Sequence, residues 1–371
     1  MKIGFVTNLR APYRTLQLNE FSKINNVNIT TYYCNDKTRN RKWKTGDKIE
    51  FDEIDLEGIK IFNKYGYINK GILNIVKNND LILIGGYEQP TYILISMLCR
   101  LLKKPYILVF DGISTNRLSE KENFIKKYLK SIVISNSKYI MGNGTVSKRY
   151  FNEVFKYPSE KIYNQYLTVD SDKINMLYKN KDRYRREYRE KLNIKETDKV
   201  LIYSGRLVDI KNVQSVIKAI AKIERNDITF LITGGGILES ELKFLSKSLG
   251  VRTIITGFIS EQEELFKHYF VGDALILPST YEPWGLVVNE AMFSGLPVIV
   301  SNVCGCSIDL VNKGGNGQII NPKDINDIKE KIEFVINDLI SQGKNNSREI
   351  IKEYTFENSR KVLEDIIKNI K

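Results

Sequence analysis

The chain has 371 residues, of which 42% are hydrophobic and 27% charged, a balance that excludes a disordered or fibrous protein. This length exceeds what one hydrophobic core usually serves, so two α/β domains are expected. The four cysteines are too few for a disulfide framework and favour a reducing compartment, and the single histidine argues against a zinc site. The net charge is +13, and residues 1–170 carry 27 Lys and Arg against 16 Asp and Glu. This excess points to an anionic partner: nucleic acid, anionic lipid or a phosphorylated acceptor.

The first half of the chain alternates predicted strands with predicted helices. Its strands are continuous apolar runs, which are typical of a parallel sheet covered by helices on both faces. The expected strands are 2–7, 27–33, 80–84, 105–110 and 138–141, and the expected helices are 15–23 and 91–102. No secretory signal opens the sequence, and its longest apolar stretch, 91–102, is too short to cross a bilayer. We therefore expect a cytoplasmic protein.

The stretch 121–134 combines lysines with a broad apolar face. This pattern is typical of a helix that lies on an anionic membrane, which would place the protein at the inner face of the plasma membrane. It is also typical of an amphipathic helix whose apolar face packs against the core. We favour the core-facing helix and keep the anionic membrane surface as an alternative.

A highly charged stretch, 170–198, interrupts the pattern and is interpreted as the interdomain connection with an exposed helix. A second α/β series follows. Its expected strands are 200–204, 228–232, 253–256, 274–278 and 297–301, and its expected helices are 213–223, 237–249, 261–270, one that carries Glu290, and 356–370. The fold class is therefore α/β, with two doubly wound, Rossmann-like domains and a ligand at a cleft faced by the carboxyl ends of the strands.

The segment 282–290 carries the most informative chemistry of the chain. Glu282 lies on the loop after a predicted strand, and Glu290 lies more than a turn inside the following helix. The free N–H groups of the helix N-terminus at Gly285 form a natural anion site between the two carboxylates. At 1.5 Å per residue, Gly285 to Glu290 spans about 7–8 Å, close to the reach from a diphosphate to its ribose hydroxyls. A plain strand–loop–helix corner with two solvated glutamates explains the spacing equally well.

The loop after the strand 200–204 contains two cations that suit a phosphate group. Gly205 permits a tight turn and close approach of a ligand. Arg206 offers a bidentate fork and Lys211 a point charge. The alternative is a pair of ordinary surface cations.

Two further strand-end loops of the second half are candidates for nucleotide contacts. Gly234 opens a triple-glycine turn that lets a backbone approach a phosphate or nucleoside. Gly257 and Phe258 form a flat loop suited to a nucleobase. A plain turn and a core phenylalanine, respectively, are the competing interpretations, and spacing alone favours the latter.

In the first half, Asp111 ends a buried strand and is the best candidate for a polar group aimed at a reacting centre. Its loop, 111–115, is expected at the same edge of the sheet as the loops 8–14 and 85–90. A helix-capping aspartate is the alternative.

Taken in order, these motifs resemble those of the retaining glycosyltransferases of family 4, which have the GT-B fold. The resemblance covers the whole second half, whereas the first half matches only through its strand pattern and residues 12–14. It rests on Gly205-Arg-Leu-Val-Asp-Ile-Lys-Asn212, Gly234-Gly-Gly236, Gly257-Phe258, Glu282-x7-Glu290, Gly295-Leu-Pro-Val-Ile-Val-Ser301 and 314–322. It implies an acceptor-binding domain at 1–170, a nucleotide-sugar-binding domain at 171–350, and a helix at 351–371 that crosses back to the first domain.

The resemblance also implies a role for each motif. Arg206 and Lys211 would hold the donor diphosphate, Glu290 would bind the ribose hydroxyls, and Glu282 would contact the transferred sugar. The backbone of the helix start and the base-facing loop would complete the donor site at Leu286, Val287, Gly257 and Phe258.

The implied activity is that of a retaining hexosyltransferase. It would move a sugar from a nucleotide sugar, with UDP as the expected nucleotide, to a glycan or lipid-linked acceptor in bacterial surface-polysaccharide or glycoconjugate synthesis. No metal or other cofactor is expected, because the only Asp-x-Asp triplet, Asp170-Ser-Asp172, is remote from the donor motifs, and two cations with helix amides can neutralise the leaving diphosphate. The chain departs from the family where Asp111 replaces a common histidine, and where Cys304-Gly-Cys306 replaces a glycine pair.

Other functions explain fewer of these features. A same-fold epimerase or phosphorylase is the nearest alternative. A basic nucleic-acid binder would account for the charge of residues 1–170 but not for the motifs of the second half, so no nucleic-acid partner is expected. A NAD-dependent oxidoreductase should open a domain with its phosphate-binding loop, and neither half does so.

Overall fold

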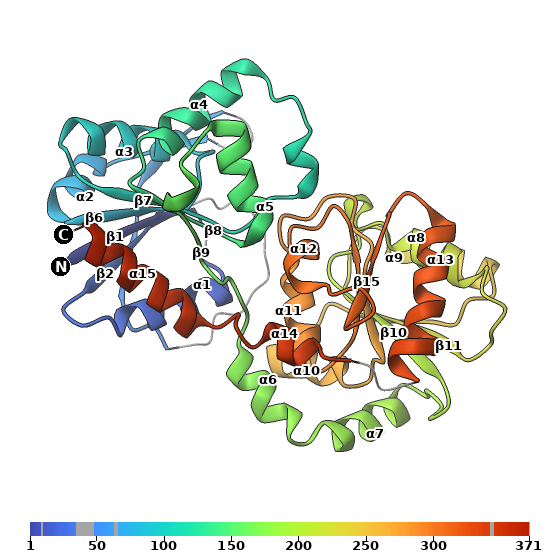
Figure 1. Cartoon of the computed structure of the whole chain (residues 1–371). Coiled ribbons are helices and arrows are strands. Elements are labelled where there is room, and N and C mark those ends of the chain that lie inside the picture. The colour runs from blue at the N-terminus through green and yellow to red at the C-terminus, as the bar shows by residue number, and fades with distance from the viewer. Residues whose placement is uncertain (9, 35–47, 63–65, 342–344, 371) are drawn as a thin grey trace. The chain divides into compact units, whose positions relative to one another are not determined.

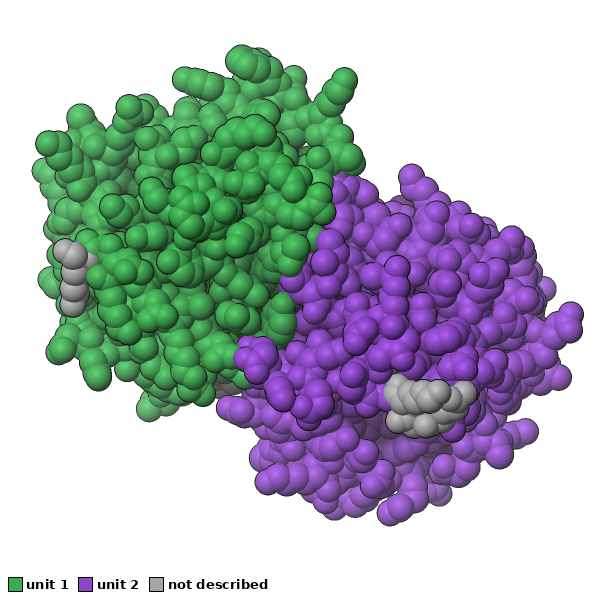
Figure 2. Space-filling view, viewed as in Figure 1, with its two compact units in different colours: residues 1–112, 117–167, 354–371 green, residues 113–116, 168–353 purple. Residues whose placement is uncertain are grey.

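The computed structural model describes residues 1–8, 10–34, 48–62, 66–341 and 345–370, which form two compact units (Figure 1 and Figure 2). Unit 1 consists of Met1–Gly112, Arg117–Leu167 and Tyr354–Lys371. Unit 2 consists of Ile113–Asn116 and Thr168–Glu353. The end of the chain therefore belongs to the same unit as its beginning.

Unit 1 is built on a parallel sheet of seven strands in the order β3-β2-β1-β6-β7-β8-β9. The strands are β1 Lys2–Thr7, β2 Asn28–Tyr33, β3 Asp52–Asp55, β6 Leu81–Ile84, β7 Tyr106–Phe110, β8 Tyr139–Gly142 and β9 Ile162–Asn164. A separate antiparallel ribbon pairs β4 Gly58–Phe62 with β5 Gly66–Asn69. The central strands are apolar along their whole length because helices cover both faces of the sheet.

The helices of unit 1 are α1 Pro12–Ser22, α2 Ile72–Asn78, α3 Pro90–Leu101, α4 Phe124–Ser135, α5 Gly144–Arg149 and α15 Phe356–Ile370. The first and last of these helices pack together. Leu363 and Ile366 of α15 are buried in the same core as Phe5 of β1 and Phe21 of α1. The last helix is thus a full member of the core of unit 1.

Unit 2 has a six-stranded parallel sheet in the order β12-β11-β10-β13-β14-β15. Its strands are β10 Lys199–Ser204, β11 Ile228–Thr233, β12 Thr253–Gly257, β13 Ala274–Leu277, β14 Val298–Ser301 and β15 Gly317–Ile320. Its helices are α6 Ser171–Tyr178, α7 Lys181–Lys191, α8 Val213–Ile220, α9 Glu239–Ser248, α10 Gln262–Tyr269, α11 Leu286–Phe293, α12 Ser307–Leu310, α13 Ile325–Phe334 and α14 Ser347–Ile351. Counted from β10, this is the Rossmann strand order 3-2-1-4-5-6.

The predicted fold class is confirmed: both sheets are parallel and each has Rossmann-like topology. β1 and the final helix begin and end at the predicted residues. Sequence patterns missed the short or half-polar elements, among them β3, β9, β15 and α12, because each offers too few residues for a periodic signal.

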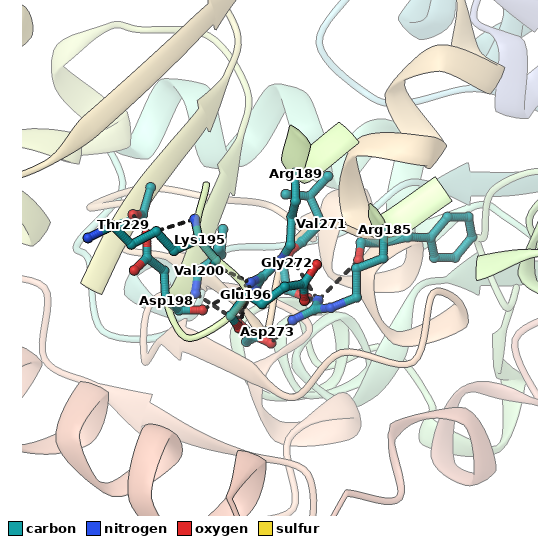
Figure 3. A network of polar contacts seen from close by, with 11 residues as sticks. Arg185, Arg189, Lys195, Glu196, Asp198, Val200, Thr229, Val271, Gly272 and Asp273 are labelled. Atoms are coloured by element: carbon teal, nitrogen blue, oxygen red, sulfur yellow. Dashed lines mark hydrogen bonds and ion pairs between the residues drawn. The ribbon is translucent and has the colours of Figure 1, made fainter. Parts of the chain in front are cut away.

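The prediction of an exposed helix within 170–198 is wrong for Arg189, a residue of α7. The side chain of Arg189 on α7 is only 1% exposed. It pairs with Asp273 at 2.9 Å and donates to the carbonyl oxygens of Lys195 and Asp198, while Arg185 reaches the other oxygen of Asp273 at 2.6 Å (Figure 3). The many charged residues of α7 suggest a helix exposed to solvent, but these contacts of Arg185 and Arg189 pack it against the rest of unit 2.

The core-facing interpretation of 121–134 holds for only part of α4. Val133 and Ile134 are buried. Phe124 and Ile125, in its first turn, are 81% and 66% exposed. In the described part of the chain, no helix combines the length and the hydropathy needed to cross a membrane.

Candidate nucleotide-sugar site

The candidate site lies at the carboxyl ends of β10 and β13, which are neighbours in the sheet of unit 2. After β10 the next strands, β11 and β12, are added on one side of it, and β13, β14 and β15 are then added on its other side. A sheet of this type binds its ligand where the strand order reverses. The loops that carry Arg206 and Glu282 follow these two strands.

Glycines allow two of the predicted loops to cross closely. A Cβ at Gly234 would lie 1.9 Å from the carbonyl oxygen of Gly205, and one at Gly236 would lie 2.3 Å from that of Leu207. The N–H of Leu207 donates to the carbonyl of Gly235 at 3.1 Å. Backbone packing therefore requires Gly234, whether or not it also meets a ligand.

Lys211 and Glu282 form an ion pair, although 71 residues separate them. Both side chains are largely buried. The backbone brings them together, because the N–H of Thr280 donates to the carbonyl of Ile210 at 2.9 Å. Lys211 closes the 3-10 turn Asp209–Lys211 after β10, and Glu282 lies on the loop after β13. The predicted cation and the predicted sugar contact thus meet in one place.

Arg206 is exposed and makes no ion pair with any residue that the structure describes. Its carbonyl accepts from the hydroxyl of Tyr203 at 2.9 Å, which fixes the backbone while the guanidinium extends into solvent. The fork of Arg206 therefore stays available for an anion.

The N-terminus of α11 is open. Gly285 precedes the helix with φ of 102°, a conformation that favours glycine, and among the described residues no side chain caps this end. The first N–H groups of a helix have no partner within the helix, so those of Leu286 and Val287 can serve an anion.

Glu290, one turn further along α11, accepts a hydrogen bond from the hydroxyl of Tyr269 at 2.6 Å. Desolvation raises the pKa of Glu290 to about 7, and the hydrogen bond from Tyr269 offsets only part of this effect. The residue as a whole is half-buried. A carboxylate held in this way can accept hydrogen bonds from two neighbouring hydroxyls.

Gly257 and Phe258 lie beside the triple-glycine loop, since Gly257 pairs with Gly234 and a Cβ on Gly235 would lie 3.4 Å from the nitrogen of Phe258. The ring of Phe258 is 55% exposed. The interpretation of Phe258 as a core residue is therefore wrong.

The loop after β14 supports Glu282 from the other side. The N–H of Gly305 donates to the carbonyl of Glu282 at 3.1 Å. A Cβ on Gly305 would come within 2.0 Å of the Pro283 carbonyl and 2.6 Å of the Ile113 carbonyl. Nearby, the Ser114 hydroxyl donates to the Val303 carbonyl at 2.8 Å. The glycine of the Cys-Gly-Cys sequence is therefore needed for packing around the loop of Glu282.

Asp111 belongs to unit 1 and is held there by α1. One carboxylate oxygen pairs with Arg14, and the other accepts from the hydroxyl of Tyr13 at 2.9 Å. Arg14 is buried, whereas the side chain of Asp111 is 42% exposed. The interpretation of Asp111 as a helix cap is wrong, because it binds side chains of α1.

The Asp-x-Asp triplet has a structural explanation. Asp170 caps α6 by accepting from the N–H of Lys173 at 3.0 Å. Within the described ranges there is no cluster of three or more His, Cys, Asp or Glu side chains suited to a metal ion.

Sequence reasoning missed three contributors to this site. Tyr269 lies in the predicted helix 261–270, Thr280 lies between the predicted strand 274–278 and Glu282, and Gly305 lies in the Cys304-Gly-Cys306 departure from the family pattern. Each acts on a partner at least 20 residues away, Glu290, Ile210 and Glu282 respectively. The glycine between two cysteines was the single signal that could have been followed.

Comparison with solved structures agrees with this architecture. Anabaena HepE, solved in complex with UDP, matches with a TM-score of 0.75 over 100% of both chains at 15% sequence identity. The two Rossmann-like units and this similarity define a protein of the GT-B fold.

Residues 184–357 match the family model described as glycosyl transferases group 1. An uncharacterized glycosyltransferase of Methanocaldococcus jannaschii is 31% identical over 239 residues, which cover 60% of this chain and 59% of that protein. Sulfoquinovosyl transferase of Arabidopsis thaliana is 30% identical over 197 residues, or 52% of this chain and 35% of that protein. The matches thus span between about a third and three fifths of these relatives.

Proposed function

We propose that the protein is a retaining glycosyltransferase that moves a hexose from a UDP-sugar to a glycan or lipid-linked acceptor in bacterial surface-polysaccharide or glycoconjugate synthesis. The observation that carries the proposal is the convergence of two cations, an open helix N-terminus and Glu290 at the carboxyl ends of β10 and β13. HepE, a protein of the same fold, binds UDP, which supports this nucleotide as the donor group.

In this proposal Arg206, Lys211 and the N–H groups of Leu286 and Val287 bind the donor diphosphate. These groups match the charge that develops on the leaving diphosphate as the sugar–oxygen bond breaks. They supply the neutralisation that a divalent metal provides in other transferases, so no metal is included. Glu290 accepts hydrogen bonds from the ribose hydroxyls, and Phe258 lies against the base with Gly257.

The acceptor hydroxyl attacks the anomeric carbon on the face from which the diphosphate departs, so configuration is retained. The bond from that carbon to the phosphate oxygen breaks, and the hydroxyl proton passes to this oxygen. Glu282 contacts the sugar and, through its ion pair, orients Lys211 before the donor arrives. A double displacement through Asp111 is disfavoured, because both of its oxygens are engaged by Arg14 and Tyr13.

The test is incubation of the full chain with radiolabelled UDP-, GDP- and ADP-sugars, with and without lipid-linked acceptors. Transfer from a UDP-sugar is expected, and the anomeric configuration of the product is read by NMR. Release of free UDP alone, a changed sugar on the same nucleotide, or an inverted product would each contradict the proposal. A changed sugar would point to an epimerase.

A further inference from the structure

Two helices of unit 1 present an apolar surface that nothing in the proposed reaction uses. α3 connects β6 to β7, and α4 connects β7 to β8. These three strands are consecutive neighbours, so right-handed crossovers place both helices on the same face of the sheet. The two helices also pack against each other (Figure 1).

Large apolar side chains are exposed on both helices. Phe124 is 81% and Leu101 77% exposed. We use the name apolar patch for the exposed side chains in the second half of α3 and the first half of α4: Met97, Leu101, Phe124, Ile125, Tyr128 and Leu129. An apolar patch rimmed by polar groups marks an interaction surface.

The stretch of chain that contains the patch carries an excess of positive charge. Residues 89–138 contain nine Lys and Arg against three Asp and Glu. All three acids are engaged internally: Asp111 with Arg14, and Glu120 and Glu122 with Arg117. Lys121 and Lys126 are exposed and form no ion pair with any described residue.

Both helices lead into a pocket lined by lysines. Lys103 and Lys104 follow α3, Lys138 comes three residues after α4, and Lys161 completes the set. The pocket has a volume of about 390 Å³, and no carboxylate is among its described lining residues. Lys104 donates to a backbone carbonyl at 2.7 Å, while the other three lysines make no ion pair within the described chain. Such a pocket is suited to a phosphate group.

We infer that the α3–α4 face of unit 1 docks on an anionic lipid bilayer. The apolar patch enters the interfacial region, Lys121 and Lys126 meet the negative surface, and the lysine pocket takes a lipid phosphate. Nucleic acid is a poorer occupant, because the aliphatic side chains Met97 and Leu101 gain nothing from a sugar–phosphate backbone. A second copy of the chain would bring the same positive charge and be repelled. The docking adds a partner to the proposed transferase and does not depend on its activity.

The direct test is co-sedimentation of the full chain with vesicles, without any nucleotide sugar. Binding is expected to vesicles of one part phosphatidylglycerol to three parts phosphatidylcholine, and not to pure phosphatidylcholine. Phe124→Ser is expected to weaken binding about tenfold. Lys103→Glu and Lys138→Glu are expected to weaken it at least about fivefold each. Raising the salt concentration should weaken binding by wild type.

Helix α9 of unit 2 provides matched controls. Phe244 is 75% exposed and Lys247 is also exposed, so Phe244→Ser and Lys247→Glu make the same chemical changes elsewhere. Both control variants should bind vesicles within about twofold of wild type. Circular dichroism confirms that every variant is folded.

Fluorescence gives a second readout that does not rely on affinity. In Phe124→Trp the emission should shift to the blue when anionic vesicles are added, and in Phe244→Trp it should not. Equal binding by Phe124→Ser and wild type, or equal binding to both vesicle types, overturns the inference. Absence of vesicle binding, together with dissociation of a dimer in Phe124→Ser, would assign the patch to a contact between copies and overturn it as well. Lys211→Ala should still bind vesicles, so failure of the transferase proposal is seen separately.

Discussion

Each unit contains a buried arginine paired with an aspartate, and the two pairs differ in how much of the carboxylate is exposed. In unit 2, Arg189 is 1% and Asp273 11% exposed, and the aspartate directly precedes β13. In unit 1, Arg14 is 6% exposed but Asp111 is 42% exposed, and this aspartate directly follows β7. The residue types are the same, yet the pairs lie at opposite ends of their strands.

The difference separates a structural pair from one suited to a ligand. Asp273 also accepts from the N–H of Val200 at 2.7 Å, so protein groups engage both of its carboxylate oxygens (Figure 3). Asp111 keeps exposed surface at the carboxyl edge of a parallel sheet, which is where α/β proteins bind ligands. Exposure and the end of the strand, rather than residue type, therefore distinguish the two roles.

The most severe test of this contrast compares the stability of two matched variants. Asp273→Asn leaves Arg185 and Arg189 without their counter-charge in a buried place, and should lower the free energy of unfolding by about 3–5 kcal/mol. Asp111→Asn should cost only about 1–2 kcal/mol, because water can reach Arg14 through the exposed side. Urea unfolding at pH 7 measures both. Equal losses would show that exposure does not separate the pairs.

The Lys211–Glu282 pair extends the comparison to the donor site. Lys211→Ala should lower the turnover number by about 10²–10³, because one group that neutralises the leaving diphosphate is lost. Its unfolding free energy should change much less than that of Asp273→Asn. Initial rates with a saturating UDP-sugar measure the effect, and Lys247→Ala on α9 is the control. Wild-type turnover in Lys211→Ala would contradict the assignment of Lys211 to the donor diphosphate.

Glu290 is a carboxylate without a cationic partner in the described chain. Its contribution to the free energy of unfolding should therefore change with pH in the opposite direction to that of a salt-bridged acid. Its folded pKa of about 7 lies above the ordinary value of 4.5, so the folded state holds an extra proton between these values. Stability should therefore fall as pH rises from 4.5 to 7 and stay low above that, by about 2 kcal/mol. Glu290→Gln should remove this dependence, which unfolding at pH 5 and pH 8 can measure. An unchanged difference in Glu290→Gln would refute the raised pKa.

The smallest expected effect concerns Phe258, an exposed ring at the edge of the same site. Phe258→Ala should weaken UDP binding by about three- to tenfold, the value of one ring contact. Calorimetric titration measures this, and Phe244→Ala, which removes another exposed ring on α9, should leave the affinity unchanged. If both variants bind UDP as wild type does, Phe258 does not contact the base.

Much of the fold was predictable because its strands are continuous apolar runs. The runs that became β1, β6 and β13 could be identified without knowing their neighbours, since burial on both faces leaves this pattern. The segment from Glu282 to Glu290 was also predictable, because a strand, a loop and a helix place its groups in a fixed order. Charged helices were harder, as α7 shows, because a sequence does not reveal which arginine finds a buried partner.

The sequence alone therefore determined the two parallel sheets and the order of the phosphate- and sugar-facing candidates along unit 2. Only the tertiary structure decided that Lys211 pairs with Glu282 and that the hydroxyl of Tyr269 donates a hydrogen bond to Glu290. It also decided that Phe124 stays exposed while Arg189 is buried. Hydrophobic periodicity indicates which residues of a segment face the core. These contacts depend on which distant segment packs against that segment, and periodicity carries no information about the partner.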